Sequence, residues 1–569
     1  MNIKQLIQTL VGSIRLQYVM FALTLMLPNI LMTFTEPQPW YTNVAQLLFG
    51  TGLFFSLMLL GKKPGRQYYV LFLFVFFGAF QCVLLWLYGN SPISVDMFLN
   101  LAATNANEAG ELLGNIIGGV IIFCSLYILM LVWAATSWNK KKLFDDRLRN
   151  RMRRLYFLPL LVGSTVLCVG LQIFTPFRFA ADVYPINVTY NAGMAICRYW
   201  QLMRYDANSQ EFTFNAASSR DATEAETYVF IIGETTRSIS LGLYGYERNT
   251  TPRLSARQGL ITYRDVLSQS NTTHKSVPLL LTAAEAIDPS PMYDERSLIA
   301  AFREAGFYTA YISNQANNGS LIDHYSCEAD MRHYIREDHP DRLPDDADML
   351  KAMREALDAS ASHPKRLFVL HLYGSHFKYC DRIPDTFPKE FQPCGDVMLA
   401  ARNHDELINA FDNTMLYTDM VVDSLIAMTD GDVPAMVLFT SDHGEDIYDD
   451  ERENFLHASP VVSFYQLAVP FTIWTNAAFN NTHPEKVGML MANREQPLSP
   501  GRVVFHTLLD AASIECQSLQ RDHSLCDSAY VPGERLFLSD RNEPLRLDQL
   551  HLTDNDFRLM REFGISFRE

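Results

Sequence analysis

Six residues able to bind a cation stand at or shortly after apolar runs of the chain: Glu234, His371, His376, Asp442, His443 and His457. Imidazole nitrogens and carboxylate oxygens are common ligands of zinc in proteins. A single histidine of this kind is more often structural than a ligand, whereas three beside carboxylates favour zinc. The pattern therefore predicts a metal site assembled from loops at the ends of several strands.

A candidate nucleophile lies in the hydroxyl-rich segment Asn271-Thr272-Thr273-His274-Lys275-Ser276-Val277-Pro278. A hydroxyl becomes a competent nucleophile when a bound metal lowers its pKa. The same residue types also begin helices, because a threonine or serine side chain caps the free N–H groups of the first turn. Both interpretations hold together, since a helix N-terminus also helps to stabilise an anion.

Short apolar runs alternate with helical stretches in the second half of the chain. Four runs predict strands: Tyr228–Ile232, Phe307–Ile312, Leu367–His371 and Met436–Thr440. A helix is expected over 403–428, between the last two runs. The alternation predicts an α/β domain over residues 221–569, with a mainly parallel sheet sandwiched by helices. Ligands of such sheets bind beyond the carboxyl ends of the strands, where most of the candidate residues stand.

The composition divides the chain into two different parts. It has 569 residues, of which 48% are hydrophobic, and this excludes a disordered protein. Residues 1–176 hold 13 basic and 6 acidic residues, a net charge of +7, whereas the remainder holds 34 and 57, a net charge of −23. The acidic second part argues against a nucleic-acid partner. Residues 177–220 include an amphipathic segment near 191–205 and are expected to form an interfacial connector.

Residues 1–176 are predicted to form a transmembrane bundle. Five apolar runs contain no Asp, Glu, Lys or Arg: 16–34, 43–60, 68–88, 116–138 and 155–175. Each is close to the ~20 residues that cross a bilayer. Basic residues gather before the first run, between the second and third, and between the fourth and fifth. The positive-inside rule then predicts a cytoplasmic N-terminus and places the chain beyond residue 176 outside.

Six cysteines lie outside the apolar runs and fit an oxidising compartment. The natural local pairs are Cys380 with Cys394 and Cys516 with Cys526. The other two, Cys197 and Cys327, either pair or stay free.

With these residues assembled, the chain resembles the phosphoethanolamine transferases of Gram-negative envelopes, in the alkaline-phosphatase/sulfatase superfamily. The resemblance spans nearly the whole chain, and these stretches carry it: Gly233-Glu234-Thr235 with Leu243-Tyr244-Gly245-Tyr246 and Thr250-Thr251-Pro252, Ser441-Asp442-His443-Gly444-Glu445, His371 to His376, and Thr104-Asn105-Ala106-Asn107-Glu108-Ala109. One departure is the absence of a lysine expected after Ile312, where Asn314-Gln315 stand.

The resemblance implies a role for each matching residue. Four would bind the principal zinc: Glu234, Thr273, Asp442 and His443. Three would hold a second zinc or the substrate phosphate, the last two also as catalytic groups: His371, His376 and His457. Four match positions linked to the ethanolamine or lipid head group: Asn100, Thr104, Glu108 and Asn314. Thr273 rather than Thr272 matches the nucleophile, because it stands five residues before Pro278 in the family's T-x-x-S-V-P motif.

The resemblance also implies the reaction. Phosphoethanolamine would pass from phosphatidylethanolamine to lipid A, a lipopolysaccharide core sugar or another surface glycan, through a covalent threonine intermediate. The enzyme would be a monomer in the bacterial inner membrane with its catalytic domain in the periplasm. It would use one or two zinc ions, or another divalent cation such as Mn. The alternatives are a phosphoglycerol transferase of the lipoteichoic acid synthase type, a membrane-anchored phosphatase or sulfatase, and a scaffold without activity.

Overall fold

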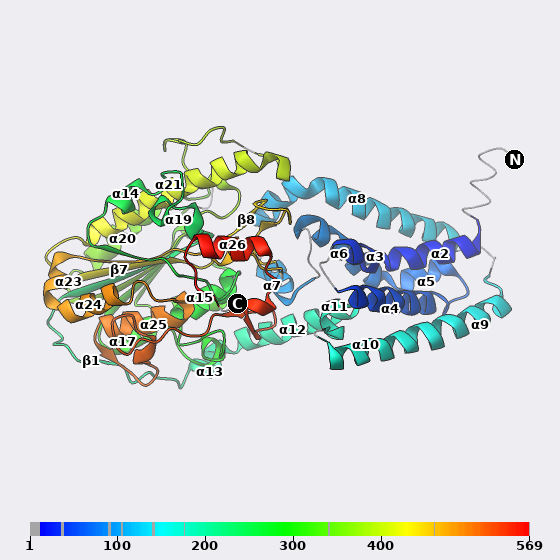
Figure 1. Cartoon of the computed structure of the whole chain (residues 1–569), viewed down its shortest axis with the longest axis horizontal. Helices are drawn as coiled ribbons and strands as arrows, with labels where there is room; N and C mark the ends of the chain where they lie inside the picture. The colour runs from blue at the N-terminus through cyan, green and yellow to red at the C-terminus, as the bar shows by residue number, and fades with distance from the viewer. Residues whose placement is uncertain are drawn as a thin grey trace. The chain divides into compact units, whose positions relative to one another are not determined.

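The computed structural model describes residues 12–35, 39–88, 93–103, 106–138, 143–175, 177–339, 342–395, 397–459 and 461–567 (Figure 1). The chain divides into two compact units. One consists of residues 1–101 and 108–196, and the other of residues 102–107 and 197–569. Each unit has apolar clusters of its own, so each is described separately.

The described chain up to residue 209 forms helices. They are α2 (Ile14–Leu25), α3 (Leu27–Thr35), α4 (Trp40–Met58), α5 (Pro64–Val70), α6 (Phe72–Tyr88), α7 (Val95–Ala103), α8 (Ala106–Trp138), α9 (Asp146–Leu155), the π-helix η1 (Tyr156–Val162), α10 (Gly163–Phe174), α11 (Phe179–Asp182), α12 (Ile186–Met203) and α13 (Tyr205–Ser209). Aromatic side chains such as Tyr18, Phe21, Phe54 and Tyr68 are buried at the centre of the first unit.

The described residues do not confirm five membrane-spanning helices. Among the described residues, Val120–Trp138 and Asp146–Phe174 are long and apolar enough to cross a bilayer. Four spans result if the bent pairs α2 with α3 and α5 with α6 each count as one. The prediction of exactly five is therefore not confirmed. The predicted run 43–60 does form a helix, α4, but its first turns carry the polar residues Thr42, Asn43 and Gln46.

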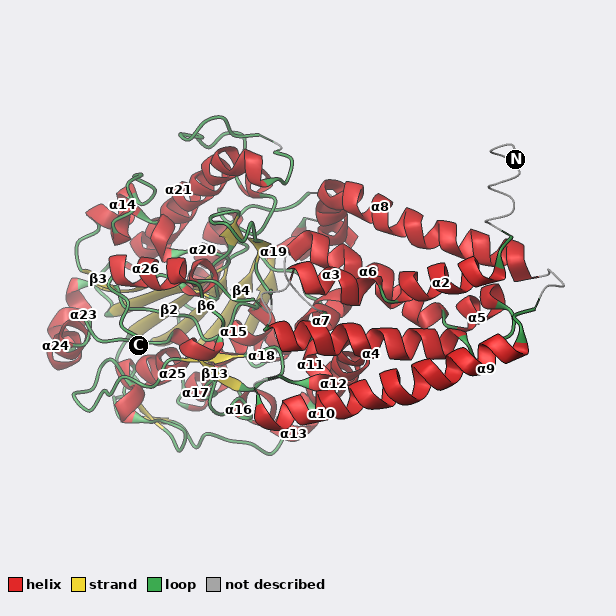
Figure 2. Ribbon diagram, turned by 45° about the vertical axis from the view of Figure 1, so that its right-hand side comes forward, coloured by secondary structure: helices red, strands yellow, loops and turns green. Residues whose placement is uncertain are grey.

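The second unit is built on a seven-stranded sheet (Figure 2). The strand order is β3 (Leu260–Tyr263), β10 (Phe471–Thr475), β7 (Ala435–Ser441), β2 (Glu226–Gly233), β6 (Lys365–His371), β4 (Tyr308–Ser313) and β5 (Met331–Tyr334). The strands from β7 to β5 are parallel, whereas β10 runs antiparallel to both of its neighbours. The sheet is therefore mixed but mainly parallel, and all four predicted strands are present.

Helices cover both faces of the sheet. Successive side chains of a strand point to opposite faces, and here the side chains on both faces are apolar. In β2, Tyr228, Phe230 and Ile232 join one buried cluster, whereas Val229 and Ile231 join another. The first cluster includes α15 (Thr273–Leu281), α17 (Leu298–Glu304) and α25 (Pro500–Ala511), and the second includes α14 (Pro252–Ala256), α20 (Asp348–Ala359) and α21 (His404–Thr429). The helix expected over 403–428 corresponds to α21.

Shorter elements complete the second unit. They are the strand pairs β1 (Ala217–Ser218) with β11 (Ile514–Glu515), β8 (Asp446–Ile447) with β9 (Phe455–Leu456) and β12 (Leu536–Leu538) with β13 (Pro544–Arg546), and the helices α16 (Pro291–Asp294), α18 (Leu321–Ser326), α19 (Ile335–Asp338), α22 (Phe464–Leu467), α23 (Ala477–Thr482), α24 (Pro484–Ala492) and α26 (Asp554–Glu562). The sulfur atoms of Cys380 and Cys394 lie 3.2 Å apart, beside the start of α21.

Candidate active site

Two carboxylate residues follow the carboxyl ends of neighbouring strands of the sheet. β2 pairs with β7 in a register that aligns Gly233 with Ser441, so the residues that follow, Glu234 and Asp442, emerge side by side. Both side chains are 1% exposed, and the neighbouring His443 is fully buried. The carboxyl ends of adjacent parallel strands are the usual place for a ligand in such a sheet. The fold thus joins groups that lie far apart in the sequence.

Thr273 faces these groups from the first turn of α15. Its Oγ1 lies 3.2 Å from Glu234 Oε2 and 3.2 Å from His443 Nε2. The first N–H groups of a helix have no partner within the helix and carry partial positive charge, so they stabilise a nearby anion. The hydroxyl predicted as the nucleophile therefore lies where negative charge is stabilised.

The tautomer of His443 turns a lone pair toward the carboxylates. Its Nδ1 lies 2.9 Å from the carbonyl oxygen of Gly444, which can only accept, so Nδ1 carries the hydrogen and Nε2 does not. Burial lowers the pKa of His443 well below its ordinary value, which keeps the ring neutral. Nε2 lies 3.1 Å from Asp442 Oδ2 and 3.6 Å from Glu234 Oε1.

These converging lone pairs lack a positive charge among the described residues. Asp442 Oδ2 is buried and has no hydrogen-bond partner in the described part of the chain. Burial and the nearby Asp442 carboxylate raise the pKa of Glu234 well above its ordinary value. Repulsion of this kind is relieved when a cation lies between the groups, so the arrangement fits a metal ion.

Ligand atoms of Glu234, His443 and His457 all lie within 4.8 Å of one another. The His457 ring lies 4.1 Å, between centroids, from the His443 ring. Its Nδ1 lies 3.5 Å from Glu445 Oε1, and Tyr379 donates a hydrogen bond to Glu445 Oε2 at 2.9 Å. A carboxylate behind an imidazole orients the ring of a metal ligand. The set of nitrogen and oxygen donors suits zinc.

The other two predicted histidines lie at the border of this cluster. The His376 ring is 6.1 Å from that of His457, and its Nδ1 lies 2.9 Å from the carbonyl oxygen of Phe377. Burial and Arg382 lower its pKa well below the ordinary value. His371 is the last residue of β6, with Nδ1 3.2 Å from the hydroxyl of Tyr311, and burial lowers its pKa to about 4.

Asn314 and Gln315 are neighbours in the sequence but contact different parts of the site. Asn314 is fully buried, and its amide donates to Asp346 Oδ1 at 2.8 Å. Asp346 in turn accepts from the backbone N–H groups of Tyr373 and Gly374, so Asn314 supports the loop that leads to His376. Gln315, for which the sequence predicted no role, donates to Glu234 Oε2 at 3.2 Å.

The remaining predicted head-group residues cannot be placed at the site. Thr104 lies outside the described residues, and the side chains of Asn100 and Glu108 lie outside the described part of α7 and α8. Their assignment stays a prediction.

Two backbone positions hold the carboxylate loops in an unusual conformation. Thr235 has φ of 61°, in the left-handed region that β-branched residues rarely adopt. Its N–H donates to Asp442 Oδ1 at 3.1 Å and its hydroxyl donates to Glu234 Oε1 at 2.7 Å. Gly374 has φ of 50°, and a Cβ there would lie 2.5 Å from the carbonyl oxygen of Glu234. Such strain persists where the surroundings fix it, and both positions adjoin the cluster.

Asn271 ties the nucleophile segment to the loop that carries His457. Its Nδ2 donates to the carbonyl oxygen of Ser459 at 2.8 Å and to Gln466 Oε1 at 2.6 Å. Its own carbonyl oxygen accepts from the N–H of Ala458 at 3.1 Å. Neither Asn271 nor Gln466 was predicted from the sequence as part of the site, because their contact depends on the paths of two distant loops.

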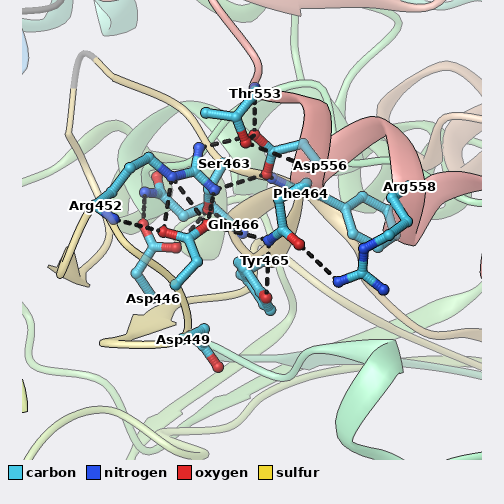
Figure 3. A network of polar contacts seen from close by, with 12 residues as sticks. Asp446, Asp449, Arg452, Ser463, Phe464, Tyr465, Gln466, Thr553, Asp556 and Arg558 are labelled. Carbon is cyan, nitrogen blue, oxygen red and sulfur yellow. Dashed lines mark hydrogen bonds and ion pairs between the residues drawn. The ribbon is translucent and has the colours of Figure 1, made fainter.

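The same loop is fastened to the last helix of the second unit. Figure 3 shows Arg452 between Asp446, Gln466 and Asp556, with Thr553 at the start of α26. Arg452 donates to both oxygens of Asp556 at 2.8 Å, and Asp556 Oδ1 also accepts from the N–H of Phe464 at 2.9 Å. Asp446 accepts from Ser463 and Gln466, both at 2.5 Å. The network fixes both ends of the segment around His457.

Comparison with known proteins agrees with this geometry. The family model described as Sulfatase matches residues 226–514. Phosphoethanolamine transferase EptC of Escherichia coli (strain K12) is 27% identical over 480 residues, covering 79% of this chain and 80% of that protein.

Solved structures share the fold. The C-terminal periplasmic domain of EcEptC from Escherichia coli, which has also been solved in complex with Zn, covers 60% of this chain and 97% of its own, with 26% identity and a TM-score of 0.54. The integral membrane protein lipooligosaccharide phosphoethanolamine transferase A (EptA) from Neisseria meningitidis covers 89% of this chain and 98% of its own, with 19% identity and a TM-score of 0.69. The chain therefore belongs to the sulfatase family and is related to the phosphoethanolamine transferases.

Proposed function

We propose that the chain is a metal-dependent transferase that moves phosphoethanolamine from phosphatidylethanolamine to an acceptor of the cell envelope. One observation carries the proposal: the hydroxyl of Thr273 lies 3.2 Å from both Glu234 and His443 at the N-terminus of a helix. A serine or threonine in this position is a nucleophile for phosphoryl transfer. The names of the related proteins support phosphoethanolamine as the transferred group.

We propose that one zinc ion would be held by four residues: Glu234, Asp442, His443 and Thr273, the last through its Oγ1. His457 completes the set or holds a second ion with His376, and His371 supports this shell. When bound, zinc would lower the pKa of the threonine hydroxyl and stabilise negative charge on the phosphate. The related E. coli domain has been solved with Zn, which supports the choice of metal.

The first step forms a covalent intermediate. Thr273 Oγ attacks the phosphorus of phosphatidylethanolamine, and the bond from phosphorus to the glycerol oxygen breaks. The proton of the Thr273 hydroxyl passes to the glycerol oxygen, so diacylglycerol leaves as an alcohol and phosphoethanolamine stays on Thr273 Oγ1. The partial positive charge at the N-terminus of α15 would stabilise the charge that develops on the phosphate oxygens.

The second step releases the group. A hydroxyl or phosphate oxygen of the acceptor attacks the phosphorus and Thr273 Oγ leaves. We assign the proton transfer of this step to His376 or His457. Burial keeps the His376 ring neutral, and with Nδ1 directed to the carbonyl of Phe377 its Nε2 can accept a proton.

The lipid donor explains the two-part chain. We propose that residues 1–176 anchor the enzyme in the bacterial inner membrane, that residues 177–220 connect the parts and that residues 221–569 work in the periplasm. The acceptor is then lipid A, a lipopolysaccharide core sugar or another envelope glycan. Asn100, Thr104 and Glu108 would contact the head group of the donor.

Mass spectrometry of the enzyme mixed with phosphatidylethanolamine, in the absence of acceptor, tests the proposal. We expect phosphoethanolamine on the peptide that contains Thr273, and none on that peptide in Thr273→Ala. Thr272→Ala is the matched control, because the neighbouring threonine is buried and its hydroxyl lies 3.3 Å from that of Ser270 instead.

Envelope analysis of cells that carry the same variants identifies the acceptor. Wild type and Thr272→Ala should add phosphoethanolamine to one lipid or glycan that Thr273→Ala leaves unmodified. Equal modification by all three would contradict the nucleophile assignment. Phosphoglycerol on the peptide, supplied by phosphatidylglycerol, would favour the lipoteichoic acid synthase type, and a free hydrolysis product alone would favour a phosphatase.

A further inference from the structure

A cavity of about 460 Å³ opens between α4, α9 and η1 in the first unit. Its walls come from the end of α4, where Ser56, Leu57 and Leu60 stand, and from Arg153, Arg154 and Phe157. None of the residues that line it has a role in the proposed transfer reaction.

Close packing fixes the walls of the cavity. A Cβ on Gly52 of α4 would lie 2.5 Å from the backbone nitrogen of Leu161, so η1 runs directly against α4 at this point. One turn further along α4, the ring of Phe55 stacks on that of Tyr156 with 4.9 Å between their centroids. The cavity is therefore a built feature between two packed helices.

The polar part of the cavity carries an uncompensated positive charge. Arg153 and Arg154 are exposed and form no ion pair with any residue in the described part of the chain. The acidic residues at the start of α9 are engaged elsewhere. Asp146 pairs with Lys62 and Arg149, and Asp145 accepts the N–H groups of the first turn.

A buried hydroxyl also lacks a partner at this point. Ser56 is 8% exposed, and its Oγ forms no hydrogen bond within the described residues. A buried hydroxyl without a partner is destabilising, and an acceptor oxygen inside the cavity would satisfy it. Two guanidinium groups and one hydroxyl donor together match the oxygens of a phosphate.

The remaining walls are apolar and open to the surroundings. Leu60 is 56% exposed and Phe157 is 52% exposed. Apolar side chains beside basic ones suit a ligand with a phosphate at one end and hydrocarbon at the other. No acidic side chain lines the cavity to pair with an ammonium group. The chemistry therefore favours an anionic phospholipid over a zwitterionic one.

We propose that this cavity binds an anionic phospholipid of the phosphatidylglycerol class, with its phosphate on Arg153, Arg154 and Ser56 and its chains along Leu57, Leu60 and Phe157. Under the positive-inside rule this basic end of the bundle lies in the cytoplasmic leaflet. The proposal is independent of the transfer reaction, since a lipid bound here would stabilise the membrane unit whatever the active site does.

Native mass spectrometry of the delipidated full chain in detergent tests the proposal. Phosphatidylglycerol, phosphatidylcholine and phosphatidylethanolamine with identical chains are added in turn. We expect a saturable phosphatidylglycerol adduct that phosphatidylcholine does not form. Phosphatidylethanolamine is the proposed donor and binds at the active site, so its adduct should not respond to substitutions in the cavity. Arg153→Gln with Arg154→Gln should weaken it about 30-fold, at about fivefold for each charge removed. Ser56→Ala should weaken it about threefold to tenfold.

Arg147→Gln with Arg151→Gln is the matched control, because it removes the same charge from the same helix outside the cavity. We expect this variant to bind like the wild type. If both double variants bound phosphatidylglycerol equally weakly, the lipid would be attracted by the net positive charge of the helix, and the proposal of a specific site would be wrong. Equal binding of phosphatidylcholine, or a phosphatidylethanolamine adduct that Arg153→Gln with Arg154→Gln weakens as strongly as the phosphatidylglycerol adduct, would also overturn it. If the first double variant does not fold, as judged by its melting temperature, Ser56→Ala decides the question.

Discussion

Asn271 allows a sharp test of how the site is held together. In Asn271→Ala the carbonyl oxygen of Ser459 and Oε1 of Gln466 each lose a buried donor that lay 2.8 and 2.6 Å away. An unsatisfied buried group costs about 1–3 kcal/mol, so the free energy of unfolding should fall by about 2–4 kcal/mol. If the loop with His457 also loosens, the rate falls, and each 1.4 kcal/mol lost from the transition state is about tenfold.

We expect kcat of Asn271→Ala to fall about tenfold to hundredfold. The assay is the initial rate of phosphoethanolamine transfer at saturating fluorescent phosphatidylethanolamine, well below the melting temperature. Asn413→Ala is the matched control: Asn413 is also fully buried, and its Nδ2 donates at 2.8 Å to the carbonyl oxygens of Phe391 and Asn409. It should lose similar stability and keep the wild-type kcat.

Two results would refute the reasoning. Wild-type kcat in Asn271→Ala, with stability lowered as expected, would mean that the tie to the His457 loop is structural only. An equal fall of kcat in Asn413→Ala would mean that any loss of stability slows the enzyme. Asn271→Asp adds a further check, because it places a carboxylate against Gln466 Oε1 and should be at least as damaging as alanine.

Three further predictions rest on the same site. Removal of metal with a chelator should lower both activity and melting temperature, because the lone pairs around Glu234 then repel one another. Added zinc should restore both. An unchanged melting temperature would contradict a bound ion. Gly374→Ala should destabilise the fold by more than Gly245→Ala, by about 1–3 kcal/mol in denaturant titrations, because both glycines have positive φ but only the first meets a backbone oxygen. Burial raises the pKa of Asp446 to about 7, so its proton is bound more tightly in the folded state and its contribution to stability is lost as pH rises from about 4 to 7. Asp446→Asn should flatten that slope of melting temperature against pH, and an unchanged slope would assign it to other groups.

The strands and the cluster of Glu234, Asp442 and His443 could be predicted because their signals are local. Apolar runs of five or six residues in this chain end in polar segments, and parallel strands present those ends at one edge. What the local pattern could not provide is the order of the strands. β10 runs antiparallel because the chain returns to the sheet at the end where β7 leaves it: Phe471, at the start of β10, pairs with Thr440 near the end of β7.

Contacts between distant loops escaped prediction for a physical reason. Gln315 contacts Glu234, and Asn271 contacts Gln466 across 195 positions of sequence. Glutamine and asparagine are common in solvated loops, so their type alone carries no signal. Only the folded paths of the loops decide that these amides are buried and which of their atoms donate.

Hydropathy located apolar helices in the first unit but not their shape. The predicted run 16–34 is continuously apolar, yet its two helices meet at Met26 with a bend of 47°. Pro28 lies in the first turn of α3, where its missing N–H and its ring cannot continue the helix before it. A proline of this kind is visible in the sequence, whereas the bend of 71° between α5 and α6 has no proline at the break, and nothing in the structure explains it.

The contact of Arg452 with Asp556 has a consequence for the order of synthesis. The two residues are 104 positions apart, so the segment around His457 leaves the ribosome long before its partner helix α26. Until residue 556 has followed, Arg452 can pair with Asp450 but not with Asp556, and the N–H of Phe464 lacks the Asp556 oxygen that it contacts in the folded unit. Nascent chains that end short of α26 would thus carry the sheet and Thr273, while the segment around His457 would lack its attachment to α26.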